Sequence, residues 1–162
     1  MEATILFAIS VFTSFIVWNK ISTKYFWPRL QEPDLKKAVQ PILMLHSFRF
    51  AGLSFLIPGV VNTGLNPAWA LPAAFGDFAA AILALITLWL IDSASFRPLL
   101  WIFNILGLAD LLLAFVDGPR YGILPFLGAG YFIIILYVPL LLLTHLMVFK
   151  LLLKKQVFAV MK

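Results

Sequence analysis

The chain has 162 residues, of which 63% are hydrophobic and only 12% are charged, with a formal net charge of +5. Soluble domains average about 25% charged residues, so this composition excludes a soluble folded monomer. The sequence contains no cysteine, which excludes disulfides, thiolate metal sites and cysteine nucleophiles. The length suits one membrane domain that comprises residues 1–162.

Five apolar segments follow one another along the chain, each about long enough to cross a bilayer as a helix. None of them alternates with period two, and backbone groups in lipid must pair within their own helix. We therefore expect an all-α polytopic membrane protein, a bundle of five transmembrane helices. The expected spans are residues 3–18, 39–61, 69–91, 98–116 and 122–149.

The longest connection, residues 19–38, differs from the short polar turns elsewhere, such as NTGLNP at 62–67. It contains two prolines, charges of both signs and three adjacent aromatic residues, 25–27. Aromatic and basic side chains favour the boundary between lipid and water. We expect an amphipathic loop that lies at the membrane interface.

Basic residues predict the orientation of the bundle. With five spans, ten of them fall on one side of the membrane and one, Arg120, falls on the other. We expect the N-terminus outside and the C-terminus in the cytoplasm of a bacterial inner membrane. The basic charges are then topology signals, which argues against a nucleic-acid partner. The ten are Lys20, Lys24, Arg29, Lys36, Lys37, Arg97, Lys150, Lys154, Lys155 and Lys162.

Three charged residues lie deep in the expected spans. A charge at the centre of a span costs about 2.5–3.5 kcal/mol on insertion scales, so such groups usually face the bundle interior. At 1.5 Å per residue, Arg49, Asp77 and Asp110 lie at about 18–22 Å from the basic edge. We predict a buried charge network in which Arg49 pairs with Asp110, Asp77 or both. The network either holds helices together or lines a functional cavity.

The two histidines, His46 and His145, fall in the cytoplasmic half of the expected bundle together with Asn104, at about 7–13 Å from the basic edge. Arg49 follows His46 by three residues and shares its helix face. These four residues predict a site for a cofactor or a small hydrophobic ligand. The most specific version of this prediction is a haem b whose iron is held by both imidazoles and whose propionate is bound by Arg49.

Three other functions stay open. Asp77, Asp110, Arg49 and His46 can form a transport or proton pathway, because histidine titrates near neutral pH. A membrane enzyme for a lipid-soluble substrate can use an Asp–His pair, or one metal held by His46, His145 and an aspartate. No HExxH, nucleophile turn or P-loop supports that reading, and no catalytic residue is assigned. The last is a structural or assembly protein, with a homo-oligomer left open.

Two stretches carry a resemblance. FNILGLADLLLAF (103–115) and GAGYFIIILYVPLLLLTHLMVFKLLL (128–153) resemble uncharacterised bacterial inner-membrane proteins of about this length, and LHSFRFAG (45–52) adds a further likeness. The resemblance implies a bacterial source and a five-helix membrane protein. It implies no activity.

Overall fold

The computed structural model describes residues 2–28 and 31–160, with the backbone alone for residues 155–160. Arg29 and Lys162, which count among the basic residues above, lie outside the described residues, as does the side chain of Lys155. The described part of the chain is all-α, and its one isolated β-bridge joins Pro58 to Val61. The prediction of an all-α protein is therefore confirmed.

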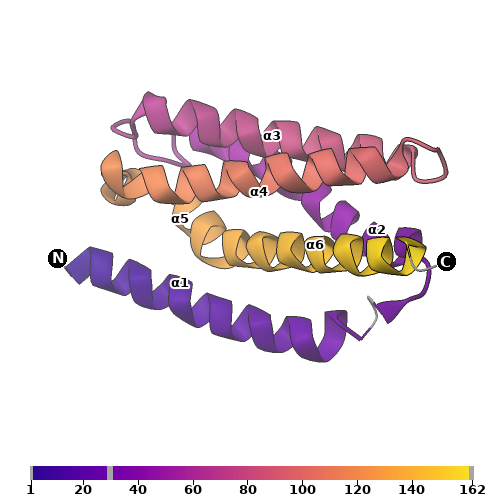
Figure 1. The fold of residues 1–162 in the computed structure, drawn as a ribbon. Coiled ribbons are helices and arrows are strands. Elements are labelled where there is room, and N and C mark those ends of the chain that lie inside the picture. Colours follow the sequence, from indigo (N-terminus) through magenta and orange to yellow (C-terminus); the bar gives the residue numbers. More distant parts are fainter. Residues whose placement is uncertain (1, 29–30, 161–162) are drawn as a thin grey trace.

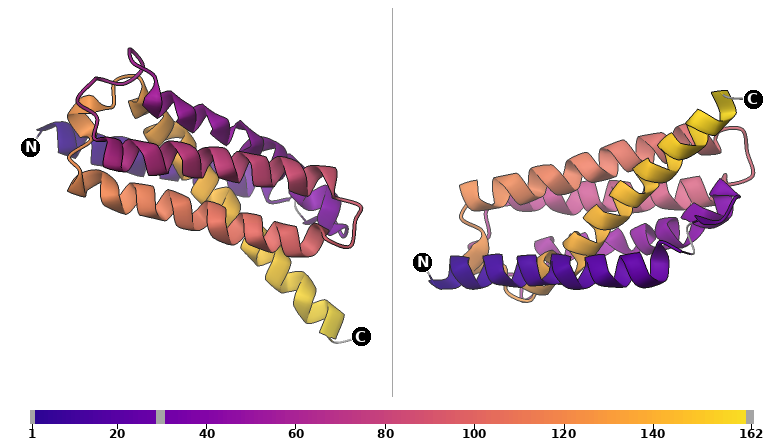
Figure 2. Two further views of the ribbon diagram at one scale, coloured as in Figure 1. Left: turned by 90° about the horizontal axis from the view of Figure 1, so that it is seen from above. Right: turned by 60° about the horizontal axis from the view of Figure 1, so that its bottom comes forward.

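Four helical stretches are long and apolar enough to cross a membrane. In Figure 1, α3 and α4 lie side by side, α6 runs next to α4, and α1 lies on the outer side of α6. Figure 2 shows that α6 crosses the bundle at an angle and that its C-terminal end extends past the other helices. The helices concerned are α1 (Glu2–Ile21) with the π-helical turn η1 (Ser22–Phe26), α3 (Pro67–Trp89), α4 (Phe96–Arg120), and α5 (Gly130–Phe132) with the π-helical η5 (Ile133–Tyr137) and α6 (Val138–Val160).

The second expected span is not one continuous α-helix. Its α-helical part, α2 (Leu35–Ser47), begins after Asp34, whose side chain accepts a 3.0 Å hydrogen bond from the amide of Lys36. A 3₁₀-helix, η3 (Phe48–Leu56), follows directly. At 1.5 and 2.0 Å per residue, residues 35–56 extend over roughly 38 Å, which exceeds a hydrocarbon core of about 30 Å.

The change of winding aligns one row of side chains with the bundle interior. A 3₁₀-helix has three residues per turn, so every third residue lies on one face. His46, Arg49, Gly52 and Phe55 follow at that interval, and all four are buried. Phe48, on the adjacent face, is exposed. The 3₁₀ geometry therefore places Arg49 inside the bundle.

The connection at 19–38 is shorter than expected, because α1 and η1 together reach Phe26 and α2 begins at Leu35. The ammonium group of Lys150 lies 5.5 Å from the ring centroid of Trp27, and Lys36 forms a 2.9 Å ion pair with Asp92. Aromatic and charged residues thus gather at this end of the bundle, and the position of this segment at a membrane interface stays a prediction.

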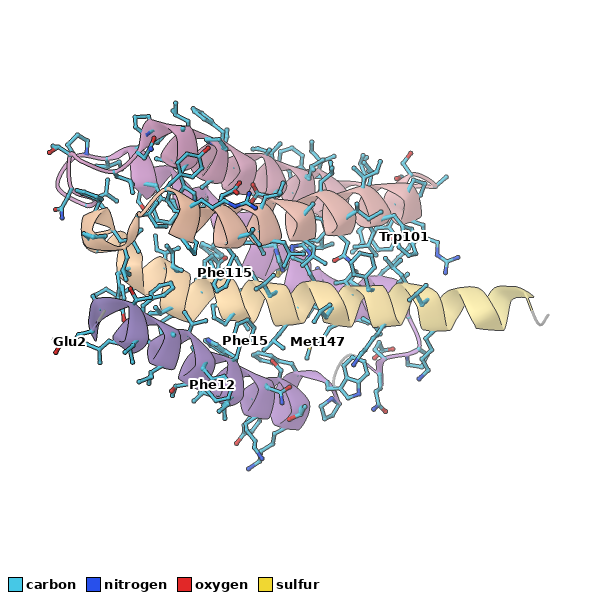
Figure 3. The ribbon with its side chains drawn as sticks, turned by 60° about the vertical axis from the view of Figure 1, so that its left-hand side comes forward. Glu2, Phe12, Phe15, Trp101, Phe115 and Met147 are labelled. Carbon is cyan, nitrogen blue, oxygen red and sulfur yellow. The ribbon has the colours of Figure 1, made fainter. Side chains whose placement is uncertain are left out.

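Helix α1 is the least buried of the long helices. Only Val11 and Ser14 are buried along it, and Phe12 points away from the other helices in Figure 3. One hydrogen bond joins α1 to η5: Nε1 of the Trp18 indole donates to the carbonyl of Leu136 at 2.8 Å. The other helices pack around three apolar clusters, of which the two larger lie near opposite ends of the bundle and the small third one comprises Leu111, Leu141 and Leu142.

Candidate functional site

Arg49 lies at the centre of a group of polar side chains between the two larger apolar clusters, and its side chain has 0% exposure. Its Nε donates to Oδ1 of Asp77 at 2.8 Å, and its Nη2 donates to Oδ2 of Asp110 at 2.6 Å. Its Nη1 donates to the carbonyl of Gly107 at 3.0 Å. The structure therefore brings together Arg49 of η3, Asp77 of α3 and Asp110 of α4.

The same guanidinium contacts one histidine and fixes its tautomer. Nη1 of Arg49 lies 3.3 Å from Nε2 of His145, and a guanidinium can only donate, so this nitrogen accepts. The ring proton is then on Nδ1, which donates to Oδ1 of Asn104 at 2.8 Å. The side-chain amide of Asn104 returns a 3.2 Å hydrogen bond to the carbonyl of His145.

The second histidine belongs to an adjoining set of contacts. The hydroxyl of Thr144 donates to the carbonyls of Leu140 and Leu141, so it accepts from Nε2–H of His46 at 2.8 Å. Nδ1 of His46 is buried and has no hydrogen-bond partner among the described residues. We call these seven residues the polar layer: His46, Arg49, Asp77, Asn104, Asp110, Thr144 and His145.

Three glycines leave space for side chains of the polar layer. A Cβ built on Gly52 would overlap the side chain of Asp77, and one on Gly76 would overlap the carboxylate of Asp110. A Cβ on Gly107 would come within 2.7 Å of the ring of His145 and 3.0 Å of the guanidinium of Arg49. Each glycine thus allows one buried polar group to approach a neighbouring backbone closely.

A cavity of about 510 Å³ lies on one side of the polar layer. Six segments form its walls. They are the first turns of α1, η3, the first half of α3, the second half of α4, the connection at 122–127, and η5 together with the first residue of α6, Val138. Phe115, labelled in Figure 3, is one of its aromatic residues. Asp77 and Asp110 line it with side chains that keep 12% and 21% exposure, and Arg49 does not line it.

The sequence predicts a binding site around the histidines, whereas the cavity lies beside Asp77 and Asp110. His46, Asn104 and His145 are each fully buried and do not line the cavity. Along α4, Asn104 and Gly107 precede Asp110, and the cavity begins at Asp110 and continues toward Pro119. The histidines therefore lie on the side of Arg49 away from the cavity, whereas both aspartates line the cavity. Sequence reasoning missed Thr144 and the Gly107 carbonyl, because neither carries a charge or an unusual spacing.

Comparison with known proteins gives one match. The sequence profile described as Domain of unknown function (DUF8737) matches residues 6–153, a range that contains the whole polar layer. The chain belongs to this family. No curated protein and no solved structure matches it. The match agrees with the expected resemblance to uncharacterised proteins, and the family description names neither an activity nor a source.

In this DUF8737 protein the two histidine rings pack against each other and against a phenylalanine. The rings of His46 and His145 have centroids 4.3 Å apart, and Phe103 packs within 5.2 Å of both. Among the residues described, no group of three or more potential ligands is suited to a metal ion. Haem b and a metal at His46 and His145 stay predictions.

Proposed function

We propose that the protein is an integral membrane protein that binds one small lipid-soluble molecule in the cavity beside Asp77 and Asp110. The observation that carries this proposal is the cavity itself. A volume of about 510 Å³ is within the usual range for ligand sites, roughly 300–1,000 Å³. Such sites combine apolar walls with a few converging polar groups, which here are the two carboxylates.

We propose that residues 35–56 cross the membrane as well. Together with the four apolar helices they give five spans. Large apolar side chains are exposed on all the long helices, among them Ile9, Phe78, Leu113 and Leu146, as contact with lipid tails would require. The positive-inside rule then puts the first residue of α1 outside and the end of α6 in the cytoplasm of a bacterial inner membrane. The cavity lies in the outer half.

Reporter fusions test this orientation. A reporter that is active only outside the cytoplasm should work after residue 65, in the connection between η3 and α3, and fail after residue 162. A fluorescent protein that folds only in the cytoplasm should give the opposite pattern. A cytoplasmic signal from position 65 would reverse the orientation and place the cavity in the inner half.

A proton pathway is less well supported than a binding site. Protons arriving at Asp77 or Asp110 would have to pass Arg49 to reach His145, and a guanidinium does not lose its proton in a protein. Its positive charge also repels an incoming proton. An Asp–His catalytic pair is equally disfavoured, because Arg49 lies between both aspartates and His145, and the hydrogen bond of His46 goes to Thr144 rather than to an aspartate.

Filling the cavity should weaken ligand binding. Ala114 lines the cavity, so Ala114→Phe should reduce the affinity for a neutral apolar probe, 4-phenylbutan-1-ol, by about tenfold or more, a loss of roughly 1.4 kcal/mol. Ala109 is exposed on the same helix, so Ala109→Phe is the matched control and should bind as the wild type does. Equilibrium dialysis of purified protein in an uncharged detergent measures both affinities.

The result to look for is saturable binding at one site per chain. Probe that partitions into the detergent micelle does not saturate and is not changed by either substitution. If Ala114→Phe and Ala109→Phe bind the alcohol equally well, the cavity is not a ligand site.

A further inference from the structure

We propose that the ligand of this cavity is an organic amine, bound as a cation with its ammonium group on Asp110 and Asp77. This inference rests on the proposed function and names its ligand class. Two carboxylates share one guanidinium, so the cluster has one excess negative charge when both are ionised. A cation in the cavity neutralises that charge.

The described residues that line the cavity offer carboxylate acceptors and no charged donor. Asp110 and Asp77 each use one carboxylate oxygen for Arg49, and both side chains remain partly exposed to the cavity. Arg49 is fully buried behind them and is engaged by both aspartates, by the Gly107 carbonyl and by His145. An anionic ligand would therefore meet carboxylates without reaching the guanidinium.

Among the described residues, the other titratable groups that face the polar layer or the cavity do not supply the missing positive charge. From α6, His145 presents a bare nitrogen to Arg49 and does not line the cavity. From η5, the hydroxyl of Tyr137 donates to the carbonyl of Leu45 at 2.6 Å. The residues of α1 that line the cavity, Ala3, Thr4 and Phe7, carry no charge. A ligand cation would be the second positive charge in contact with the aspartates.

The walls also suit an amine. Phe7, Phe55, Trp69 and Phe115 line the cavity, and the faces of aromatic rings attract cations. The indole N–H of Trp69 is already bonded to the carbonyl of Ala114 at 2.9 Å, so this residue offers its ring rather than its donor. A ligand with an ammonium group at one end and an apolar body would match both the carboxylates and the apolar walls.

Three probes of one skeleton test the inference: 4-phenylbutylamine, 4-phenylbutan-1-ol and 4-phenylbutyrate. We expect the wild type to bind the amine at least about tenfold more tightly than the alcohol, and the carboxylate most weakly. Asp110→Asn should remove the preference for the amine and keep the affinity for the alcohol, which also shows that the variant is folded. Asp117→Asn is the matched control, because Asp117 lies on the same helix, pairs with Arg120 and does not line the cavity.

The outcomes separate this inference from the proposed function. Equal binding of amine and alcohol by the wild type, or an amine preference that survives in Asp110→Asn, would overturn the amine proposal and leave the cavity as a site for neutral ligands. Tighter binding of 4-phenylbutyrate would overturn it as well. Failure of all three probes to bind at one saturable site would overturn both proposals.

Discussion

Arg49→Leu should lower the free energy of unfolding by about 3–5 kcal/mol, the usual cost of removing one partner from a buried ion pair. The substitution replaces the guanidinium with a shorter, apolar side chain and leaves the carboxylates of Asp77 and Asp110 without their cation. It also leaves the Gly107 carbonyl and Nε2 of His145 without a donor. Unfolding in mild detergent, followed by the loss of helical circular dichroism, measures the change.

Removing the carboxylates as well distinguishes the cost of unpaired charge from the cost of lost packing. Arg49→Leu combined with Asp77→Asn and Asp110→Asn should be more stable than Arg49→Leu alone, because no unpaired charge remains buried. Arg120→Leu is the control, since Arg120 pairs with Asp117 at the surface and such pairs contribute about 0–1 kcal/mol. Stability losses that simply add across the three substitutions would show that the ion pairs do not couple.

Gly76→Ala should destabilise the protein by about 1–3 kcal/mol, the range for forcing an extra methyl group into a packed interior. The new Cβ would occupy the position of the Asp110 carboxylate and push it from Arg49. The sign of this change in stability is informative, because glycine in the middle of a helix costs about 0.5–1 kcal/mol relative to alanine. An alanine that met no neighbour would therefore stabilise α3.

A double-mutant cycle isolates the contact. In an Asp110→Ala background the carboxylate is gone, so Gly76→Ala should become neutral or stabilising, whereas in the wild type it destabilises. The measurement is the same detergent unfolding curve for all four proteins. If Gly76→Ala costs the same in both backgrounds, Asp110 does not lie against this turn of α3.

Hydropathy alone predicts the helical architecture, since spans of apolar residues in lipid have few other options. It could not predict where α2 changes into η3, because α and 3₁₀ windings bury equally apolar residues. A signal was nevertheless present in the sequence. His46, Arg49, Gly52 and Phe55 are spaced by three, and an α-helix would spread such a series around its axis.

Depth along each span placed Arg49, Asp77 and Asp110 at one level, and the structure joins them there. The same depth argument predicts a ligand site at His46 and His145, whose rings pack against each other and Phe103, and that ligand site stays a prediction. Depth does not report rotation about a helix axis, so it cannot distinguish a packed ring from one that lines a cavity. The cavity itself is the space left by six separate segments, and no local pattern encodes it.

The order of the polar layer along the chain has a consequence for biosynthesis. Arg49 is made 28 residues before Asp77 and 61 residues before Asp110, the two groups that neutralise it. An arginine that enters the bilayer alone carries the insertion cost of about 2.5–3.5 kcal/mol. In the proposed five-span topology, residues 35–56 therefore gain their full stability in the membrane only after α3 and then α4 have left the ribosome. Insertion of this second span would thus depend on carboxylates encoded downstream of it, in α3 and α4.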